Sequence, residues 1–312
     1  MGAVLPFLYP SVDPQSILED SDSAPIPDLH KTMFRFVKKI TQASWEMSAA
    51  DIETLRAASI PDEETVRWAQ IASLQGWWTM SADGSGIPLE GDTTTGPVLH
   101  KPREWYEGAA EGLTAADPEA NAAPATAADA TCWVETETDS PAFEADAQQA
   151  RERYGFVPGV LVAGSLRPEI GRRHLEALQL LEKPQTSHLS PRAHALVRAR
   201  STALNRSAYG AVTTRALLER VTGDAELFAR VQAPLQAPGA WSDKERVVLA
   251  FTDKLVRNAY KVTEKDALAF REVGLSDEAY VDVLDTASIQ TSLDRLANAL
   301  GVTPDAAPSL AT

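Results

Sequence analysis

The sequence predicts an all-α protein, and three observations support this fold class. Apolar residues recur at helical spacing along the chain, and no stretch shows the alternation typical of a half-buried strand. Helix starts carry capping residues, such as Ser190 followed by Pro191. One helical segment also occurs twice at a constant offset. We therefore expect helices packed on helices throughout.

The N-terminal part is expected to combine an extended arm with a first group of helices. Residues 1–30 are rich in Pro, Asp and Ser and carry too little apolar surface to fold alone, so they are interpreted as the arm. From Met33 the pattern turns helical, and Ser48 with Asp51 three residues later indicates the start of a second helix. This helical half unit should cover residues 31–91.

A third helix should run from Pro61 to Trp78 and lead into Gly84-Ser-Gly, which is interpreted as a turn. The segment recurs, since residues 36–90 align without a gap on residues 251–305. Residues shared at this shift of 215 positions include Phe36 and Phe251, Lys39 and Lys254, Asp51 and Asp266, Arg56 and Arg271, Gln75 and Gln290, and Gly86 and Gly301. So many matches at one offset predict a duplicated element.

A segment of low complexity separates the two copies. Gly112 to Thr131 is mostly Ala, Asp, Glu, Pro and Thr, so residues 92–142 are expected to form a linker or solvated loop, although the alanines suit a helix equally well. Order resumes near Phe143, where a longer unit over residues 143–306 should begin. Residues 307–312 are left as a tail.

The longer unit contains the junction that is the first candidate for a site. A helix from Arg167 to Leu181 should precede a second helix capped by Ser190. The pattern is then interrupted from Asn205 to Gly210, and a third helix resumes at Ala211. Its free backbone N–H groups should point into this break, which makes the junction a good place for chemistry.

Composition and charge exclude several classes of protein. The chain has 312 residues, 44% of them hydrophobic, enough to bury a sizeable core. A formal net charge of −15 and a pI near 4.8 argue against nucleic acid or an anionic membrane as a partner, because both would be repelled. The N-terminus lacks a positive leader and a long apolar run, so we expect a cytoplasmic protein. The single cysteine, Cys132, excludes a dithiol cycle within one chain.

Several short motifs in the longer unit carry a family resemblance. They are Arg153-Tyr-Gly-Phe-Val-Pro-Gly, Leu189-Ser-Pro-Arg, Ala203-Leu-Asn-Arg-Ser-Ala-Tyr-Gly, Trp241-Ser-Asp-Lys-Glu-Arg, Val262-Thr-Glu-Lys-Asp and Gly274-Leu-Ser-Asp-Glu. Through their order and spacing, residues 143–306 resemble the alkylhydroperoxidase-D-like, or carboxymuconolactone decarboxylase, superfamily. Residues 31–91 resemble the C-terminal half of such a unit. The resemblance implies a complete helical unit preceded by a half unit, and a homodimer or larger homo-oligomer.

The residues that serve peroxide reduction in this superfamily are missing. Members with that activity carry a Cys-x-x-Cys pair, a Glu twelve residues before the first Cys and a His four residues after the second, which supply thiolate attack, resolution and proton transfer. These four positions are Ser207, Gly210, Ala195 and Thr214 here. The family's peroxidase activity is therefore not expected, whereas the decarboxylase branch works without the thiol pair.

Three residues near the junction are candidates for catalysis. Tyr209 could donate a proton, or equally pack in the core with its hydroxyl satisfied. His194 could be a general base, but a helix position facing solvent is as reasonable, and it points about 100° away from the lost Glu at residue 195. Ser207 could be a nucleophile, although a role as helix cap is favoured because no base is placed nearby.

Seven further residues are candidates for substrate binding: Arg198, Arg200, Asn205, Thr214, Trp77, Trp78 and Gln290. The two arginines could clamp a carboxylate, yet most helical arginines simply face water. Asn205 could instead shape the turn. The adjacent tryptophans cannot both face one core, so one could line a pocket or a subunit contact, and packing against the second unit is the favoured alternative.

No metal or cofactor is implied. The five histidines show no ligand spacing such as His-Glu-x-x-His, and Gly84-Ser-Gly does not lie between a strand and a helix as a phosphate loop would.

Two hypotheses of function remain. The first is a cofactor-independent enzyme that acts on a small molecule by acid-base chemistry, such as decarboxylation, isomerisation or cyclisation, in a helical cavity. The second is a catalytically silent binding or assembly protein of the same fold. A junction where Tyr209, His194 and an arginine converge on an enclosed pocket would favour the first.

Overall fold

The computed structural model describes residues 9, 11–86, 132–181, 188–235 and 241–305. Within these ranges the regular structure is helical, without strands, so the predicted all-α class is confirmed. Most of the linker and the C-terminal tail predicted from sequence lie outside the described residues. None of the helices in the described ranges has the length and apolar character that a membrane crossing requires.

The N-terminal helices precede the gap at residues 87–131. They are α2 (Pro14–Glu19), α3 (Asp28–Ala43), the 3₁₀ turn η1 (Ser44–Glu46), α4 (Ala49–Ala57) and α5 (Asp62–Ser85). The later helices are α7 (Pro141–Tyr154), α8 (Gly159–Ala163), α9 (Pro168–Leu181), α10 (Pro191–Asn205), α11 (Ala208–Thr222), α12 (Leu227–Gln232), α13 (Asp243–Asn258), η3 (Ala259–Lys261), α14 (Glu264–Glu272) and α15 (Asp277–Leu300).

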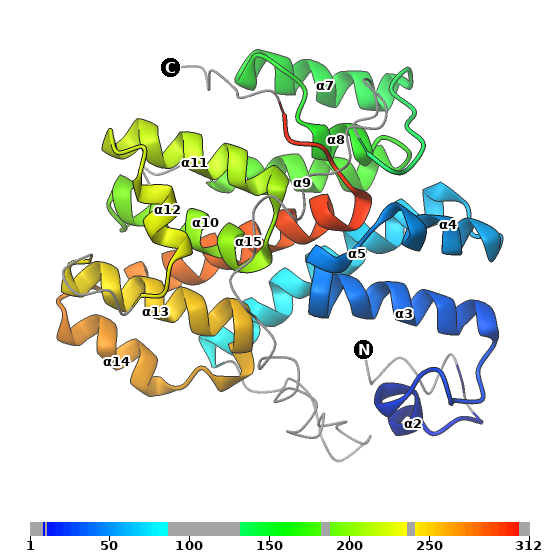
Figure 1. Cartoon of the computed structure of the whole chain (residues 1–312), viewed down its shortest axis with the longest axis horizontal. Coiled ribbons are helices and arrows are strands. Elements are labelled where there is room, and N and C mark those ends of the chain that lie inside the picture. Colours follow the sequence, from blue (N-terminus) through cyan, green and yellow to red (C-terminus); the bar gives the residue numbers. More distant parts are fainter. Residues whose placement is uncertain (1–8, 10, 87–131, 182–187, 236–240, 306–312) are drawn as a thin grey trace.

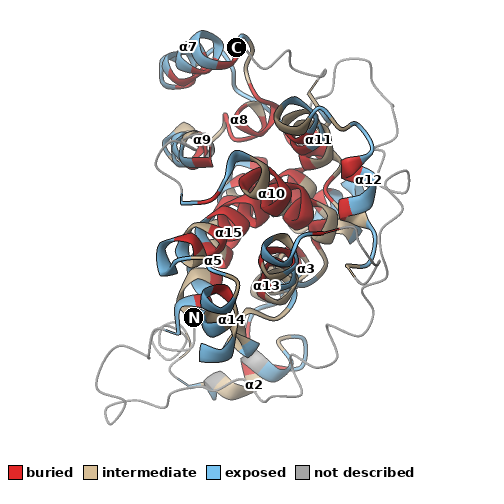
Figure 2. Ribbon diagram, turned by 90° about the vertical axis from the view of Figure 1, so that its left-hand side faces the viewer, coloured by how far each residue is buried: buried red, intermediate tan, exposed pale blue. Residues whose placement is uncertain are grey.

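Helix α15 is the centre of the molecule. It packs along α5 over most of its length and also contacts α10, α11, α13 and α9 (Figure 1). Its residues are largely buried, as are those of α10 beside it (Figure 2). Because α15 is surrounded on most sides, a polar residue on it must find a partner inside the protein.

The bounds of the N-terminal helices recur in the C-terminal part at the shift found in the sequence. Helices α3, η1, α4 and α5 each begin and end 215 positions before α13, η3, α14 and α15. Their internal ion pairs correspond as well, because Lys39 Nζ lies 2.8 Å from Asp51 Oδ1 and Lys254 Nζ lies 2.9 Å from Asp266 Oδ1. The packing is reciprocal, with η1 against α15 and η3 against α5. A duplicated origin of these elements stays a prediction.

Most predicted helix starts agree with the structure. Ser190 accepts a hydrogen bond from the Ala193 N–H with Pro191 at the first helical position, and Ser48 forms a capping box with Asp51. These caps satisfy backbone donors that would otherwise have no partner.

Two local predictions differ from the structure. Residues 11–30 hold the short helix α2, and Ile17, Ala24 and Ile26 form a small buried cluster, so this part is more than an extended arm. Gly84 and Ser85 belong to α5 and only Gly86, at φ 64°, ends the helix, so the interpretation of Gly84-Ser-Gly as a turn was wrong. A glycine inside the helix is explained by packing, because a Cβ at residue 84 would meet Leu284 Cδ1 of α15 at 2.3 Å.

Candidate functional site

The break between α10 and α11 is only two residues long. Arg206 has a left-handed conformation at the end of α10, with φ of 51°, and Ser207 precedes α11. The Ser207 Oγ accepts a hydrogen bond from the Gly210 N–H at 3.1 Å, so Ser207 serves as the helix cap. Helix α11 therefore begins at Ala208, three residues before Ala211, where the apolar pattern had indicated its start. Its first turn is set by the Ser207 cap and not by apolar residues.

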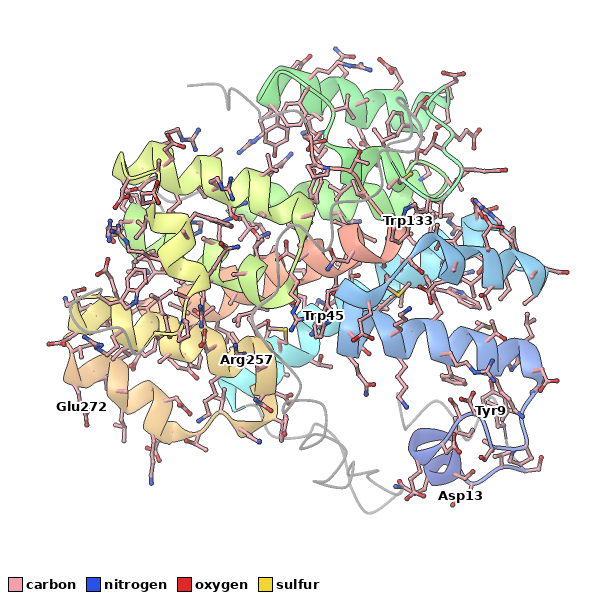
Figure 3. All side chains as sticks on the ribbon, in the orientation of Figure 1. Tyr9, Asp13, Trp45, Trp133, Arg257 and Glu272 are labelled. Atoms are coloured by element: carbon pink, nitrogen blue, oxygen red, sulfur yellow. The ribbon has the colours of Figure 1, made fainter. Side chains whose placement is uncertain are left out.

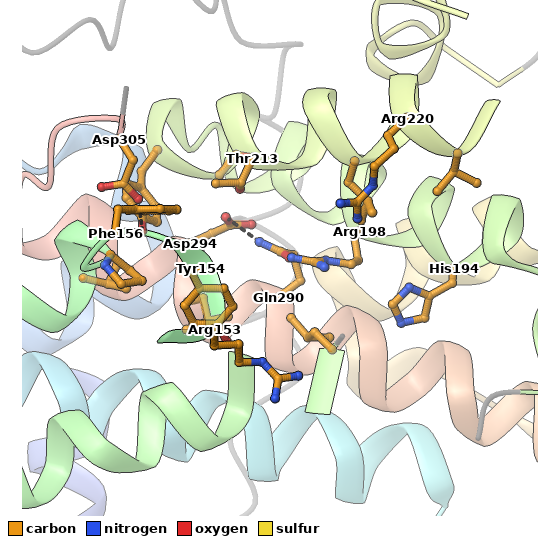
Figure 4. Close-up of a pocket in the computed structure, with 18 of the residues that line it drawn as sticks. Arg153, Tyr154, Phe156, His194, Arg198, Thr213, Arg220, Gln290, Asp294 and Asp305 are labelled. Atoms are coloured by element: carbon orange, nitrogen blue, oxygen red, sulfur yellow. Dashed lines mark hydrogen bonds between the residues drawn. The ribbon is translucent and has the colours of Figure 1, made fainter. Parts of the chain in front are cut away.

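A cavity of about 390 Å³ lies beside this junction, between α7, α8, α10, α11 and α15 (Figure 4). Its polar lining comprises Arg153, Tyr154, His194, Arg198, Tyr209, Thr213, Arg220, Gln290, Asp294 and Asp305. Apolar lining comes from Phe156, Val160, Leu181, Leu217 and Leu293, among others. A concave space of this size with a few convergent polar groups is typical of a small-molecule site.

Asp294 of α15 is the carboxylate inside this cavity with the largest change in acidity. Its side chain is fully buried, and Thr202 Oγ1 donates to Oδ2 at 3.0 Å while Asn205 Nδ2 donates to the same oxygen at 3.3 Å. Burial raises the pKa of Asp294 to about 7, against the opposing effect of its hydrogen-bond donors and of Arg198. Both protonation states are therefore populated near neutral pH.

Gln290 links Asp294 to an arginine. Arg198 Nε donates to Gln290 Oε1 at 3.0 Å, and Gln290 Nε2 donates to Asp294 Oδ1 at 3.1 Å. Since the arginine occupies the carbonyl oxygen, the amide nitrogen must face the carboxylate. Gln290 thus connects Arg198 to Asp294 by two hydrogen bonds (Figure 4).

Gly210 leaves the space that the Asp294 carboxylate fills. A Cβ at residue 210 would lie 2.1 Å from Asp294 Oδ1 and 2.9 Å from Thr202 Oγ1. From its sequence motifs, position 210 was matched to the second cysteine of the alkylhydroperoxidase-D-like superfamily. The structure therefore has a buried carboxylate where a side chain at that position would project.

Asp305 lies at the other end of the cavity from His194 (Figure 4) and forms a hydrogen bond with Tyr209. The Tyr209 hydroxyl donates to Asp305 Oδ2 at 2.7 Å, and the Gly159 N–H donates to Oδ1 at 2.9 Å. Burial raises the pKa of Tyr209 well above its ordinary value, and burial also raises the pKa of Asp305. Tyr209 is thus a neutral hydrogen-bond donor at neutral pH.

Cationic side chains surround the cavity from three helices. Arg153 ends α7, Arg198 is in the middle of α10 and Arg220 lies near the end of α11 (Figure 4). His194 is one turn before Arg198, and burial, aided by Arg198, lowers its pKa to about 4. Its imidazole is therefore neutral at pH 7. Three arginines thus line one cavity in a chain whose net charge is −15.

The other predicted site residues lie around the cavity or away from it. Asn205 reaches Asp294, whereas Thr214 is buried and donates to the Gly210 carbonyl. Arg200 points to the opposite side of α10, where its Nη2 lies 2.7 Å from Asp253 Oδ2. Trp77 packs against Leu181 and Leu293 behind the cavity wall, while Trp78 is 65% exposed.

The sequence reasoning missed Asp294, Asp305, Arg153 and Arg220. Asp294 had a detectable signal, because it lies four residues after Gln290 and therefore on the same helix face. Asp305 follows the helix end at Gly301 and had no such signal. Among the described residues, no group of three or more His, Cys, Asp or Glu side chains could hold a metal ion.

Fold and site together define an all-α protein with an arginine-lined cavity at a helix junction. The sequence matches no known family profile and no curated protein. The structure is similar to an uncharacterized peroxidase-related protein from Silicibacter sp. TM1040, with a TM-score of 0.50 and 20% identity, over 56% of this chain and 93% of that chain. A second similar structure is the alkylhydroperoxidase AhpD core, an uncharacterized peroxidase-related protein from Ralstonia eutropha JMP134, with a TM-score of 0.46, 25% identity and coverage of 52% and 85%.

The likeness to the first structure confirms the alkylhydroperoxidase-D-like helical fold that the sequence motifs predicted. At 20% identity it shows the fold alone. The activity has to be argued from the residues of the cavity.

Proposed function

We propose that this protein is a cofactor-independent enzyme that moves a proton on a small organic anion bound in the cavity. The observation that carries the proposal is Asp294, a fully buried carboxyl group whose pKa is raised to about 7. A general acid or base works best when its pKa lies near the working pH. Decarboxylation, isomerisation and cyclisation are the reactions that such a group can serve without a thiol or a redox partner.

The hydrogen bonds around Asp294 suit it to both directions of proton transfer. Thr202, Asn205 and Gln290 hold the carboxyl group in place, so its position does not depend on the bound molecule. In a decarboxylation, the bond between the carbon and its carboxylate would break, the electron pair would stay on carbon, and that carbon would take the proton of Asp294 as CO₂ leaves. In an isomerisation, Asp294 would remove a proton from one carbon and return it to another.

The arginines supply the binding energy for an anionic substrate. A carboxylate that pairs with Arg198 would lie close to Gln290, and through it close to Asp294. Arg220 lies on the neighbouring helix and Arg153 on α7, so a substrate with a carboxylate can be held from more than one side. Hydrogen bonds to charged groups contribute about 1.5–3 kcal/mol each, which is enough to orient a small ligand.

A thiol peroxidase mechanism does not fit the junction. Ser207 is occupied as a helix cap, and Gly210 has no side chain to replace the second thiol. The single cysteine, Cys132, donates to the Val134 carbonyl and is not part of the cavity lining.

The proposal can be tested without knowing the substrate. Metabolites extracted from cells that lack the protein are incubated in D₂O with the wild type or with Asp294→Asn, and compounds are compared by mass spectrometry. We expect anionic compounds that lose CO₂, rearrange or gain deuterium only with the wild type. Asn is nearly isosteric with Asp but does not titrate, so an identical set of changes with both proteins would refute the proposal, as would the absence of any change.

A second candidate function, assembly without catalysis, is favoured by one exposed face of α5. Trp78 is 65% exposed and Ile71, two turns earlier on the same face, is 49% exposed. If this face is a subunit contact, Trp78→Ser lowers the mass measured by light scattering while the fold persists, with Trp77→Phe as the half-buried neighbour for comparison. Assembly and catalysis are compatible, but a protein that assembles and fails the deuterium test would be a catalytically inactive protein of this fold.

A further inference from the structure

The N-terminal 3₁₀ turn η1 contacts the α10–α11 junction through residues that do not line the cavity. Trp45 of η1 lies against Arg206, whose guanidinium carbon is 4.8 Å from the centroid of the indole ring (Figure 3). Arg206 is the residue with the left-handed conformation, which costs free energy for any residue with a Cβ. Stacking on an aromatic face is one interaction that compensates for this cost. The N-terminal helices therefore stabilise the turn that ends α10.

A second contact fixes the residue just before that turn. Asn298 of α15 donates through Nδ2 to the Asn205 carbonyl at 3.0 Å and to Ser44 Oγ, also from η1, at 3.1 Å. Ser44 is buried, so this bridge is shielded from water. Trp45 of η1 thus contacts Arg206 directly. Its neighbour Ser44 is linked to Asn205 through Asn298.

Asn205 connects this contact to the cavity. Its side chain donates through Nδ2 to Asp294 Oδ2 at 3.3 Å, to Thr291 Oγ1 at 3.0 Å and to the Ser201 carbonyl at 2.8 Å. The two hydrogens of one amide group are shared among three acceptors, so a small shift of the Asn205 backbone changes which acceptor is served. The acceptor at the longest distance is the Asp294 carboxylate, which makes it the first to lose its donor.

We propose that Trp45 and Ser44 are positioning residues for the acid-base site, acting through Arg206, Asn298 and Asn205 to keep a hydrogen-bond donor on Asp294. The inference rests on the proposed function, because it assigns the N-terminal half unit a part in setting the acidity of that same carboxyl group. It gives the half unit a role beyond covering the apolar face of α15.

Other charged groups also act on Asp294 and have to stay constant in a test. Arg198 from α10 favours its ionised form, and Arg295 is its neighbour on α15. Elsewhere in the cavity lie Arg153 from α7, Arg220 from α11, His194, Tyr209 and Asp305. None of these side chains belongs to η1, so replacing Trp45 leaves the charges of the cavity unchanged.

The experiment measures the ionisation of Asp294 and needs no substrate. Unfolding free energies of the wild type and Asp294→Asn are measured by urea titration at a series of pH values, and the pH dependence of their difference gives the midpoint for Asp294. The same pair is then measured in the Trp45→Leu background. Loss of one donor should move the midpoint upward by about half to one pH unit.

Tyr260→Leu is the matched control, because Tyr260 occupies in η3 the position that Trp45 occupies in η1. We expect it to lower stability and leave the midpoint of Asp294 unchanged. If Trp45→Leu does not fold, Asn298→Ala replaces it, since it removes the bridge between Ser44 and Asn205 while Trp45 stays.

The outcomes separate the two proposals. An unchanged midpoint in the Trp45 or Asn298 variant, or an equal shift in Tyr260→Leu, overturns the positioning role. A wild-type midpoint near the ordinary value for Asp, about 4, instead overturns the proposed function, because Asp294 would then be no acid-base group at neutral pH. An upward shift confined to the Trp45 and Asn298 variants supports the positioning role.

Discussion

The Asp294 carboxylate and the α-carbon of Gly210 lie so close that a single added carbon could not be accommodated. A Cβ on residue 210 would be 2.1 Å from Asp294 Oδ1, well inside the distance at which real atoms pack. The absence of a side chain on α11 and the presence of a carboxylate on α15 are therefore two parts of one arrangement.

Gly210→Ala should destabilise the protein in spite of the better helix propensity of alanine. We expect a loss of about 1–3 kcal/mol in the free energy of unfolding, because overpacking forces Asp294 and Thr202 apart. Gly171→Ala in α9 is the control, since its Cβ would meet its nearest neighbour at an ordinary 3.5 Å. Urea titration checks both, and the pair Gly210→Ala with Asp294→Ala should recover stability. If Gly210→Ala and Gly171→Ala lower stability equally, residue 210 is not in close contact with Asp294.

Asp294 should make the protein less stable as the pH rises towards neutrality. Its pKa is about 7 in the folded chain and 3.8 as the ordinary value, so between about pH 4 and 7 the folded state holds a proton that the unfolded state has lost. Stability falls as the pH rises through this window and is flat on either side. Relative to Asp294→Asn, the wild type should lose roughly 3–5 kcal/mol across it. A pH-independent difference would show that Asp294 ionises normally.

Arg220→Gln should weaken binding of the anionic compound identified by mass spectrometry. Loss of a charged hydrogen bond of about 1.5–3 kcal/mol corresponds to roughly a tenfold to hundredfold higher KM, with kcat little changed because Asp294 is intact. Arg215→Gln on the same helix is the control, since Arg215 stacks on Phe228 outside the cavity. Steady-state kinetics checks both variants, and a fall in kcat at constant KM would argue against a binding role.

Tyr209→Phe should cost more stability than Tyr280→Phe. The Tyr209 hydroxyl donates to the half-buried carboxylate of Asp305, and the Tyr280 hydroxyl donates to the Gly84 carbonyl, which is uncharged. We expect losses of about 2–3 and about 1 kcal/mol respectively. Without the phenol the pKa of Asp305 rises further, so the penalty should grow with pH as that carboxyl ionises. Denaturation at two pH values distinguishes this from a loss of packing, which would be independent of pH.

Cys132→Ala should leave the activity unchanged and should abolish labelling by thiol reagents. The thiol donates to the Val134 carbonyl at 3.4 Å, away from the cavity, and the chain has no other cysteine. Thermal unfolding of the variant provides the control for folding. Inactivation of a folded Cys132→Ala would overturn the non-redox mechanism.

Helix starts and the repeat were predictable because they depend on local sequence. Ser48, Ser190 and the residues that follow them satisfy backbone donors within one turn, which needs no knowledge of the rest of the fold. The recurrence of helix bounds at one offset follows equally from identities along the chain. The end of α5 was misplaced because Gly84 is set by packing against α15, which sequence patterns do not reveal.

The composition of the site was less predictable because it depends on which helix face meets the cavity. Gln290 and Arg198 were named, and both line it, but Arg200, two residues after Arg198, faces Asp253 on α13. Apart from its spacing from Gln290, Asp294 is one of 44 acidic residues, and only the structure shows that it is buried. Its altered acidity arises from tertiary packing and had no counterpart in local spacing.

The reciprocal packing of η1 on α15 and η3 on α5 has a consequence for how the molecule can vary. In a dimer of identical chains, every substitution appears on both sides of the two-fold axis. In this chain the two sets of elements can change independently, and Thr79 of α5 stands 215 positions before Asp294 of α15. A buried carboxyl group lowers stability, and this arrangement confines that effect to α15, since α5 has a neutral residue at the matching position.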